Sequence, residues 1–284
     1  MTVPGTVGVL GGGRMGAGIA HAFLLAGSRV ILVERDAESA DAARERVLAS
    51  IAASVQRGDL SDADHATSSL SVSTDFADFA AAALVVEAVP EDRDLKAGAL
   101  ARIEDAVAAE AVLATNTSSI SIDDLAASLA RPDRFLGLHF FNPVPASKLV
   151  EIVVGERTAK DVVTSAREWV ATLRKTPVVV RDSPGFASSR LGVMLALEAI
   201  RMLEENVADA ADIDAAMELG YRHPMGPLRT TDVVGLDVRL GIAEELAREL
   251  GLRFEPPALL RRMVAEGKLG RKSGEGFYVW NEER

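Results

Sequence analysis

The sequence contains no cysteine, and its 31 lysine and arginine residues are outnumbered by 42 aspartate and glutamate residues, for a net charge of −11. The lack of cysteine excludes disulfides, thiolate zinc sites and a cysteine nucleophile, and we predict no metal site. The negative charge argues against binding to nucleic acid or to an anionic membrane, because both require a positive field. No apolar run approaches the roughly 20 residues that span a bilayer. An apolar strand pattern begins close to Met1 and leaves no room for a signal peptide, so we expect a cytoplasmic protein.

Apolar residues, by contrast, make up 48% of the 284 residues, which is enough for one large or two ordinary domains. The most informative stretch is Val7–Gly16, which reads V-G-V-L-G-G-G-R-M-G. Gly11, Gly13 and Gly16 have G-x-G-x-x-G spacing between an apolar run and a helical pattern. Such glycines allow a sharp turn, close approach of the backbone to a pyrophosphate, and close packing of helix on strand. We therefore predict a dinucleotide site rather than a purely structural glycine turn.

The next apolar run, 30–33, ends in Glu34, about 20 residues after the glycines, where an acidic residue binds the adenosine ribose. Arg35 is suited to a 2′-phosphate, but the Glu34 carboxylate would repel that group, so NAD is favoured over NADP. Arg35 is equally well explained as a solvated surface charge. The cofactor-binding candidates in this region are Gly11, Gly12, Gly13, Arg14, Met15, Gly16 and Glu34.

Short apolar runs alternate with helical patterns through the first part of the chain, and this alternation predicts a Rossmann-type, doubly wound parallel sheet. The strand-like runs are 6–10, 30–33, 68–73, 84–89, 112–115, 135–139, 149–154 and 177–180. Strand signals stop at Asp182-Ser183-Pro184-Gly185, and the remaining residues have helical spacing. We predict an α/β protein with two domains: an NAD-binding domain over residues 1–183, and a smaller all-α domain over 184–284. The apolar stripes of the helices in the second domain are most simply explained as its core, and next as a dimer interface.

Three polar residues near the ends of predicted strands are suited to removing a proton from an alcohol. His139 ends one strand, and Glu151 lies on the next strand, close enough to hydrogen-bond the imidazole. A carboxylate on one ring nitrogen fixes the tautomer and stabilises the imidazolium as it forms. Ser118 follows a neighbouring strand and is placed to donate to the same substrate oxygen, although it is also explained as a helix N-cap. Together with the nucleotide site, these residues favour a catalytic role over a structural one.

Several motifs resemble the L-3-hydroxyacyl-CoA dehydrogenase family over essentially the whole chain. The first half contains G-G-G-R-M-G-A-G-I-A at 11–20, N-T-S-S at 116–119 and H-F-F-N-P-V-P-x-x-K-L-V-E at 139–151. The second half contains D-x-P-G-F at 182–186, H-P-M-G-P at 223–227, V-G-L-D at 234–237 and G-R-K-S-G-E-G-F-Y at 270–278. The resemblance implies an NAD-dependent oxidation of a short 3-hydroxyacyl-CoA to the 3-oxoacyl-CoA, which is reversible.

The resemblance also implies roles for individual residues. His139 matches the family's catalytic base, Glu151 its carboxylate partner, and Ser118 a serine between nicotinamide and substrate. Positions expected to contact NAD are Glu91, Lys96, Asn142 and Lys272, with Glu34 on the ribose. Positions expected to contact CoA are Ser50 and Arg57. The resemblance further implies that residues 184–284 serve in substrate binding and dimerisation, with a homodimer formed through the C-terminal helices.

One departure concerns the stretch P-G-F-A-S-S-R at 184–190, where Ser189 stands in place of an asparagine that helps to hold the substrate carbonyl in the family. Serine still donates a hydrogen bond, but it is shorter and reaches as far only through a water. The surroundings of Arg57 are also less basic than in the family. These departures leave open a dehydrogenase of a free or carrier-protein-bound hydroxy acid. A non-catalytic NAD-binding relative is a further alternative, against which the intact His139–Glu151 pair argues.

Overall fold

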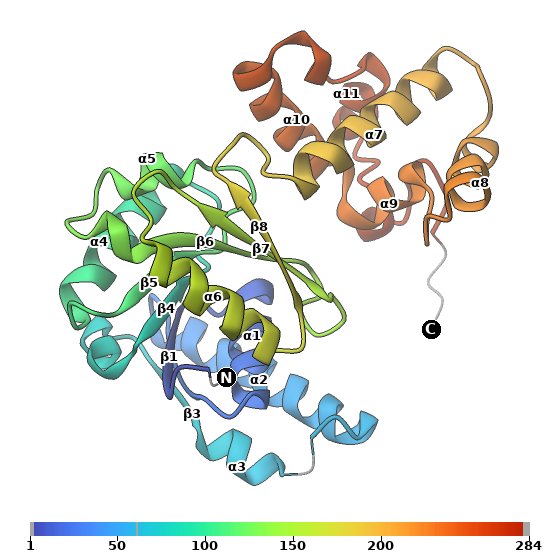
Figure 1. Cartoon of the computed structure of the whole chain (residues 1–284). Coiled ribbons are helices and arrows are strands. Elements are labelled where there is room, and N and C mark those ends of the chain that lie inside the picture. Colours follow the sequence, from blue (N-terminus) through green and yellow to red (C-terminus); the bar gives the residue numbers. More distant parts are fainter. Residues whose placement is uncertain (1–2, 61, 281–284) are drawn as a thin grey trace. The chain divides into compact units, whose positions relative to one another are not determined.

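The computed structural model describes residues 3–60 and 62–280 of the chain. Its backbone contacts divide it into two compact units, Met1–Asp182 and Ser183–Arg284. The first unit contains an eight-stranded sheet with helices, and the described part of the second is built from helices (Figure 1). The expected α/β class with a helical C-terminal part is thereby confirmed. The division lies one residue before the expected boundary between residues 183 and 184.

In the first unit, strands and helices alternate as the apolar runs predict. The strands are β1 (Thr6–Leu10), β2 (Arg29–Val33), β3 (Leu70–Ser73), β4 (Leu84–Glu87), β5 (Val112–Thr115), β6 (Phe135–Phe140), β7 (Leu149–Val154) and β8 (Thr176–Arg181). The α-helices are α1 (Arg14–Leu25), α2 (Ala37–Arg57), α3 (Ala63–Ser68), α4 (Arg93–Ala106), α5 (Ile122–Ala126) and α6 (Lys160–Thr172). Two 3₁₀ turns complete the unit, η1 (Phe76–Ala81) and η2 (Pro132–Arg134).

The strand order is β3-β2-β1-β4-β5-β6-β7-β8, and all neighbouring strands are parallel except β6 and β7. The expectation of a wholly parallel sheet is therefore wrong for this one pair. The connection between Phe140 and Leu149 contains no helix, and a parallel crossover needs about a dozen or more residues, so the chain reverses direction here. The antiparallel register sets His139 directly opposite Glu151.

The central strands β1, β4 and β5 are buried on both faces. Successive strand residues point to opposite sides of the sheet, so apolar runs of this kind need cover on each side. Val7 and Val9 of β1 belong to a cluster that includes buried residues of α1, α2 and α6. Val85 and Leu113 of the neighbouring strands are also fully buried. With both faces covered, the edge formed by the carboxyl ends of the parallel strands is where such sheets place ligands.

The second unit has a core of its own, formed by the apolar faces of its helices. They are α7 (Ser188–Glu204), α8 (Ala210–Tyr221), α9 (Pro227–Val234), α10 (Leu236–Leu250) and α11 (Ala258–Ala265), with the 3₁₀ turns η3 (Leu252–Phe254) and η4 (Arg271–Ser273). Two fully or nearly buried carboxylates organise the motifs of this unit. Asp214 accepts hydrogen bonds from the backbone N–H groups of Leu228 and Arg229, at the start of α9. Asp232 accepts from the N–H groups of Phe277 and Tyr278.

Glycines in these motifs have a packing reason. A side-chain carbon at Gly226 would lie 2.2 Å from Asp214, and one at Gly276 would lie 2.2 Å from the Asp232 carboxylate. Both distances are far below van der Waals contact, so only glycine lets the backbone approach each carboxylate. The motifs H-P-M-G-P and G-R-K-S-G-E-G-F-Y therefore include structural positions.

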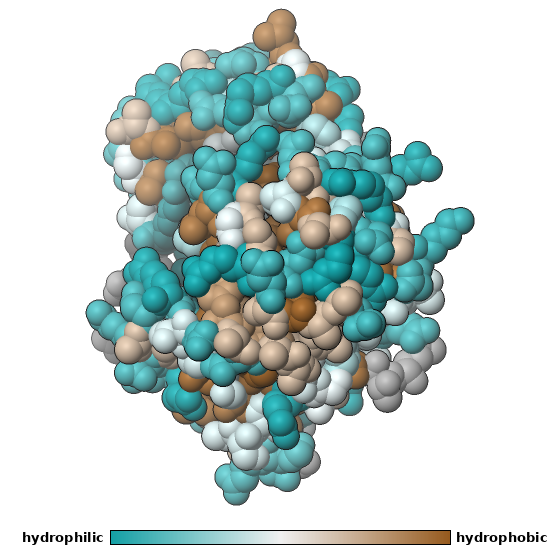
Figure 2. Space-filling view, turned by 90° about the vertical axis from the view of Figure 1, so that its left-hand side faces the viewer, coloured by the Kyte–Doolittle hydropathy of each residue, from teal (hydrophilic) through white to brown (hydrophobic). Residues whose placement is uncertain are grey.

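The surface view in Figure 2 shows hydrophilic residues around smaller apolar patches on one face. In the part of the chain that the structure describes, no helix is long and apolar enough to cross a membrane.

Candidate active site

The glycine-rich stretch forms a tight turn between β1 and α1. Gly11 has a φ of +91°, a conformation that favours glycine. A side-chain carbon on Gly16 would lie 1.7 Å from the Gly11 carbonyl oxygen, so only glycine lets α1 pack this closely on the turn. Gly13 is exposed and would have no heavy atom near such a carbon, and the first turn of α1 that follows has no side-chain cap. Open backbone N–H groups at a helix N-terminus fit a pyrophosphate.

Glu34 lies beside this turn, at the end of β2. Its Oε1 accepts a hydrogen bond from the Gly12 N–H at 2.6 Å, and its Oε2 accepts from the Arg35 N–H at 3.1 Å. Arg35 points to solvent and pairs with Asp36, as a solvated surface charge would. Sequence reasoning missed Arg46 of α2, whose guanidinium donates to the Gly12 carbonyl at 3.1 Å. No local sequence pattern predicts that contact, because it joins a helix to a loop 34 residues earlier in the chain.

His139 and Glu151 meet as predicted. Nδ1 of His139 lies 2.8 Å from Oε2 of Glu151, and the two residues are 6% and 1% exposed. The Phe141 ring packs beside the imidazole, with 4.4 Å between ring centroids. The Asn116 side-chain oxygen accepts from the Phe140 N–H at 2.8 Å and ties the loop after β5 to the end of β6. The imidazole is thus positioned by the carboxylate of Glu151 and by packing against the Phe141 ring.

Glu91 organises the loop that carries Ser118. Its Oε1 accepts from Thr117 Oγ1 at 2.6 Å, from the Ser118 N–H at 2.9 Å and from the Ser119 N–H at 3.2 Å. Burial raises the pKa of Glu91, but the Lys96 ammonium and the bonds from Thr117 and Ser118 outweigh it, so the pKa lies below its ordinary value. The alternative role of Ser118 as the cap of the next helix is wrong, because Ser121 caps α5.

Lys96 lies beneath this loop and is only 1% exposed. Its Nζ is 2.9 Å from Oε1 of the fully buried Glu87 and 3.3 Å from Oε2 of Glu91. Glu87 also accepts from Thr115 Oγ1 at 2.6 Å. Sequence reasoning missed Glu87 and Thr115, although an acid at the end of the apolar run L-V-V-E is a signal for a buried partner. The contact of Lys96 with NAD stays a prediction.

The remaining candidates lie in several places. In the first unit, Ser50 donates to the carbonyl of Arg46, and Asn142 precedes Pro143 through a cis peptide bond in an exposed loop. Arg57 lies at the end of α2, where it pairs with Asp59. Two candidates belong to the second unit: Ser189 in the first turn of α7, and Lys272, whose Nζ lies 2.5 Å from Asp237.

The structure brings one group of candidates to a single edge of the sheet. The glycine turn follows β1, Glu34 follows β2, Glu91 follows β4, Ser118 follows β5, and His139 lies near the end of β6. Among the residues that the structure describes, no group of three or more histidine, cysteine or acidic side chains is placed to hold a metal ion.

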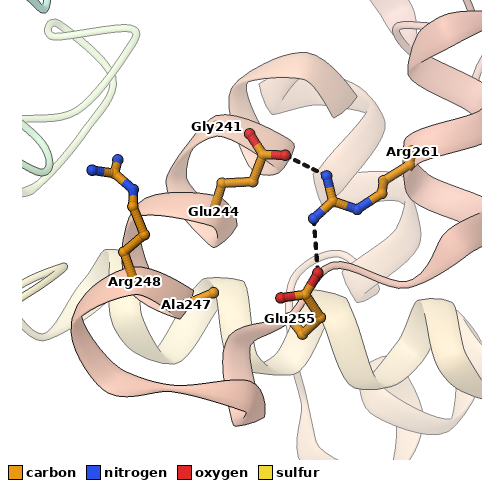
Figure 3. Close-up of a pocket in the computed structure, with 6 residues that line it drawn as sticks. All are labelled: Gly241, Glu244, Ala247, Arg248, Glu255 and Arg261. Atoms are coloured by element: carbon orange, nitrogen blue, oxygen red, sulfur yellow. Dashed lines mark hydrogen bonds and ion pairs between the residues drawn. The ribbon is translucent and has the colours of Figure 1, made fainter.

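A hollow on the second unit contains none of these candidates. Its lining residues are Gly241, Glu244, Ala247, Arg248, Glu255 and Arg261 (Figure 3). Arg261 pairs with Glu244 and, at 2.8 Å, with Glu255 (Figure 3). Arg248 pairs instead with Glu245, outside the lining. The described lining of the hollow contains no histidine, so it has no acid–base pair like His139 and Glu151.

A sheet of this strand order, with a glycine turn and a buried His–Glu pair at one edge, defines a Rossmann-type NAD-dependent dehydrogenase. Two family models match the chain: the 3-hydroxyacyl-CoA dehydrogenase NAD binding domain over residues 6–183, and the C-terminal domain of the same family over residues 185–280. The chain belongs to the 3-hydroxyacyl-CoA dehydrogenase family, which confirms the resemblance and the NAD cofactor.

Similar proteins cover nearly the whole chain. A probable 3-hydroxybutyryl-CoA dehydrogenase of Deinococcus radiodurans is 41% identical over 275 residues, which are 96% of this chain and 99% of that protein. A 3-hydroxybutyryl-CoA dehydrogenase of Mycobacterium tuberculosis is 42% identical over 279 residues, covering 96% of this chain and 98% of that protein. The crystal structure of the (S)-3-hydroxybutyryl-CoA dehydrogenase of Ralstonia eutropha matches with a TM-score of 0.94 at 38% identity, over 98% of this chain and 100% of that chain.

Proposed function

We propose that this NAD-dependent 3-hydroxyacyl-CoA dehydrogenase acts on short-chain substrates such as (3S)-3-hydroxybutyryl-CoA. We further propose that His139 is its general base and Glu151 the carboxylate partner of that base. The proposal rests mainly on the buried contact of 2.8 Å between His139 Nδ1 and Glu151 Oε2, which lies at the same edge of the sheet as the glycine turn. The relatives named above that act on 3-hydroxybutyryl-CoA support the short chain length.

Glu151 fixes which nitrogen of His139 takes part in the reaction. A carboxylate accepts hydrogen bonds only, so Nδ1 carries the proton and Nε2 has the lone pair. Nε2 takes the proton of the substrate 3-hydroxyl as the C3–O bond becomes a carbonyl and the C3 hydride leaves. The buried Glu151 carboxylate then stabilises the imidazolium. NAD, when bound, supplies the hydride acceptor.

The cofactor and the substrate oxygen have separate groups to hold them. The open backbone at Gly13 and the uncapped first turn of α1 fit the pyrophosphate, with Glu34 on the ribose hydroxyls. We assign to Ser118 a hydrogen bond to the substrate oxygen, with Glu91 holding its loop in place. Further assigned contacts to NAD are those of Lys96, Asn142 and Lys272.

Other residues are assigned to the CoA portion and to the carbonyl group of the substrate. We assign Ser50 and Arg57 to CoA, since Arg57 presents a guanidinium that suits a phosphate. We assign Ser189 to the substrate carbonyl.

We also propose that the protein forms a homodimer through the C-terminal helices. Three large apolar side chains of the second unit support this proposal because they are exposed. Leu219, Tyr221 and Leu252 are 84%, 76% and 85% exposed. Light scattering on the purified protein tests this point: a dimer is expected, and a monomer at micromolar concentration would contradict it.

A second candidate function is oxidation of a free or carrier-protein-bound hydroxy acid. The observation that favours it is the ion pair of Arg57 with Asp59 at 2.9 Å, which offsets part of the positive charge available to a CoA phosphate. Initial rates of NADH formation on (3S)-3-hydroxybutyryl-CoA, its (3R) epimer and free 3-hydroxybutyrate distinguish the two. We expect activity on the (3S)-CoA thioester, and activity on the free acid alone would overturn the CoA assignment.

A further inference from the structure

The end of α2 holds Arg57 from two sides. Gly58 adopts a left-handed conformation and turns the chain back, so that Asp59 meets the guanidinium, with 2.9 Å between Nε and the carboxylate. On the other side, Nη2 of Arg57 donates to Ser54 Oγ at 3.0 Å. A guanidinium has five N–H donors, so these two bonds leave donors for a phosphate. Arg57 itself is exposed, whereas Ser54 is fully buried.

Ser54 has a second partner below it, on α1. Nε2 of His21 lies 3.0 Å from Ser54 Oγ, and His21 is only 1% exposed. Because an arginine only donates, the Ser54 hydroxyl accepts from Arg57 with one lone pair. Its contact with Nε2 of His21 then uses either the hydroxyl proton or the second lone pair, depending on the tautomer of the ring. The three side chains form a chain of hydrogen bonds from the core to the surface.

The surroundings of His21 favour the neutral form of its ring. Burial lowers the pKa of His21, and the positive charges of Arg57 and Lys175 lower it further. Asp59 and a backbone hydrogen bond at Ser50 act in the opposite direction, but the pKa stays below its ordinary value. At neutral pH the neutral ring hydrogen-bonds Ser54 in either tautomer, so the series of contacts from His21 through Ser54 to Arg57 is kept.

We infer that Ser54 and His21 are positioning residues for Arg57, and that they set the affinity for the phosphates of the acyl-CoA substrate without touching it. This inference rests on the assignment of Arg57 to CoA under the proposed function. Pre-setting a long cationic side chain lowers the conformational entropy that binding a phosphate costs. The network thus acts on the CoA portion of the substrate and not on the reacting carbon.

The test compares two thioesters: 3-hydroxybutyryl-CoA, and 3-hydroxybutyryl-N-acetylcysteamine, which lacks the nucleotide phosphates. Ser54→Ala is expected to raise KM for the CoA thioester about fivefold, with kcat within about twofold and no change in KM for the small thioester. Ser68→Ala, which removes an exposed helix serine of the same unit, is the matched control and leaves all constants unchanged.

His21 variants separate hydrogen bonding from packing. His21→Gln keeps a side-chain amide that can donate to or accept from the Ser54 hydroxyl and is expected to keep the wild-type KM. His21→Leu removes the hydrogen-bonding group and is expected to raise KM for the CoA thioester as Ser54→Ala does, with no further increase in the double variant. Equal loss with both thioesters in Ser54→Ala, or no change with either, overturns the inference.

Arg57→Ala distinguishes this inference from the proposed function. It is expected to raise KM for the CoA thioester about tenfold, and Ser54→Ala in that background then adds nothing. If Arg57→Ala leaves KM unchanged, the CoA assignment of Arg57 fails, and the inference falls with it. If Arg57→Ala raises KM but Ser54→Ala does not, the inference fails alone.

Discussion

Replacing Glu151 with glutamine changes the charge beside His139 and little else. The variant keeps the length and planarity of the side chain, at a position that is 1% exposed and registered directly opposite His139. An amide oxygen still accepts from Nδ1, but it no longer stabilises an imidazolium by charge. A hydrogen bond to a charged group contributes up to about 3 kcal/mol and a neutral one as little as about 0.5 kcal/mol. The largest difference, about 2.5 kcal/mol, corresponds to nearly a hundredfold in rate.

The assay measures initial NADH formation with saturating NAD and (3S)-3-hydroxybutyryl-CoA, and separately NAD affinity by fluorescence. We expect kcat to fall roughly a hundredfold in Glu151→Gln, and the NAD dissociation constant to change by less than about threefold, because the glycine turn is untouched. Glu156→Gln, the same chemical change at an exposed position just after β7, is the control and keeps full activity. A Glu151→Gln enzyme with kcat within about threefold of the wild type would refute the reasoning.

Three further predictions concern the cofactor turn, the second unit and pH. Gly16→Ala places a carbon 1.7 Å from the Gly11 carbonyl, so we expect NAD affinity to fall more than about tenfold in titrations, and unchanged affinity would contradict the geometry. Asp232→Asn weakens the three bonds that Asp232 accepts from Phe277, Tyr278 and Trp280, and urea unfolding should show a loss of about 2–4 kcal/mol; a loss below about 0.5 kcal/mol would count against this role. The pKa of His21 is lower in the folded than in the unfolded protein, so the unfolded state binds more protons and stability falls as pH drops below about 6.5. His21→Gln removes this contribution, so the free energy of unfolding should fall less for the variant than for the wild type when the pH is lowered from about 7.5 to about 5.5. Parallel pH curves for the two proteins would contradict this prediction.

The glycine turn and the His–Glu pair were predictable because each depends on a short pattern. The spacing of Gly11 and Gly16 indicates that a side chain would not fit at either position, and in the structure the backbones of the two residues lie too close for one at Gly16. His139 and Glu151 lie on successive apolar runs, and successive strands are commonly neighbours. The antiparallel direction was missed, although the short proline-containing link that causes it was visible in the sequence.

The network around Glu91 was not predictable in the same way. Its carboxylate joins the segment after β4 to the loop after β5, and its ion pair with Lys96 depends on how α4 packs under that loop. Glu87 completes this network from the sheet interior. Such partners are chosen by tertiary packing among many acidic and basic residues, and no spacing rule in the sequence selects them. The links of Asp232 to the C-terminal segment were missed for the same reason.

The most direct test of the account is the rate of His139→Gln, measured together with its NAD affinity. Glutamine does not take the hydroxyl proton, and general-base catalysis is worth about a hundred- to ten-thousandfold. We predict that NADH formation from (3S)-3-hydroxybutyryl-CoA falls by at least about a hundredfold, while the NAD dissociation constant stays within about threefold of the wild type. A His139→Gln enzyme that retains more than about a tenth of the wild-type rate would contradict the assignment of His139 as the base.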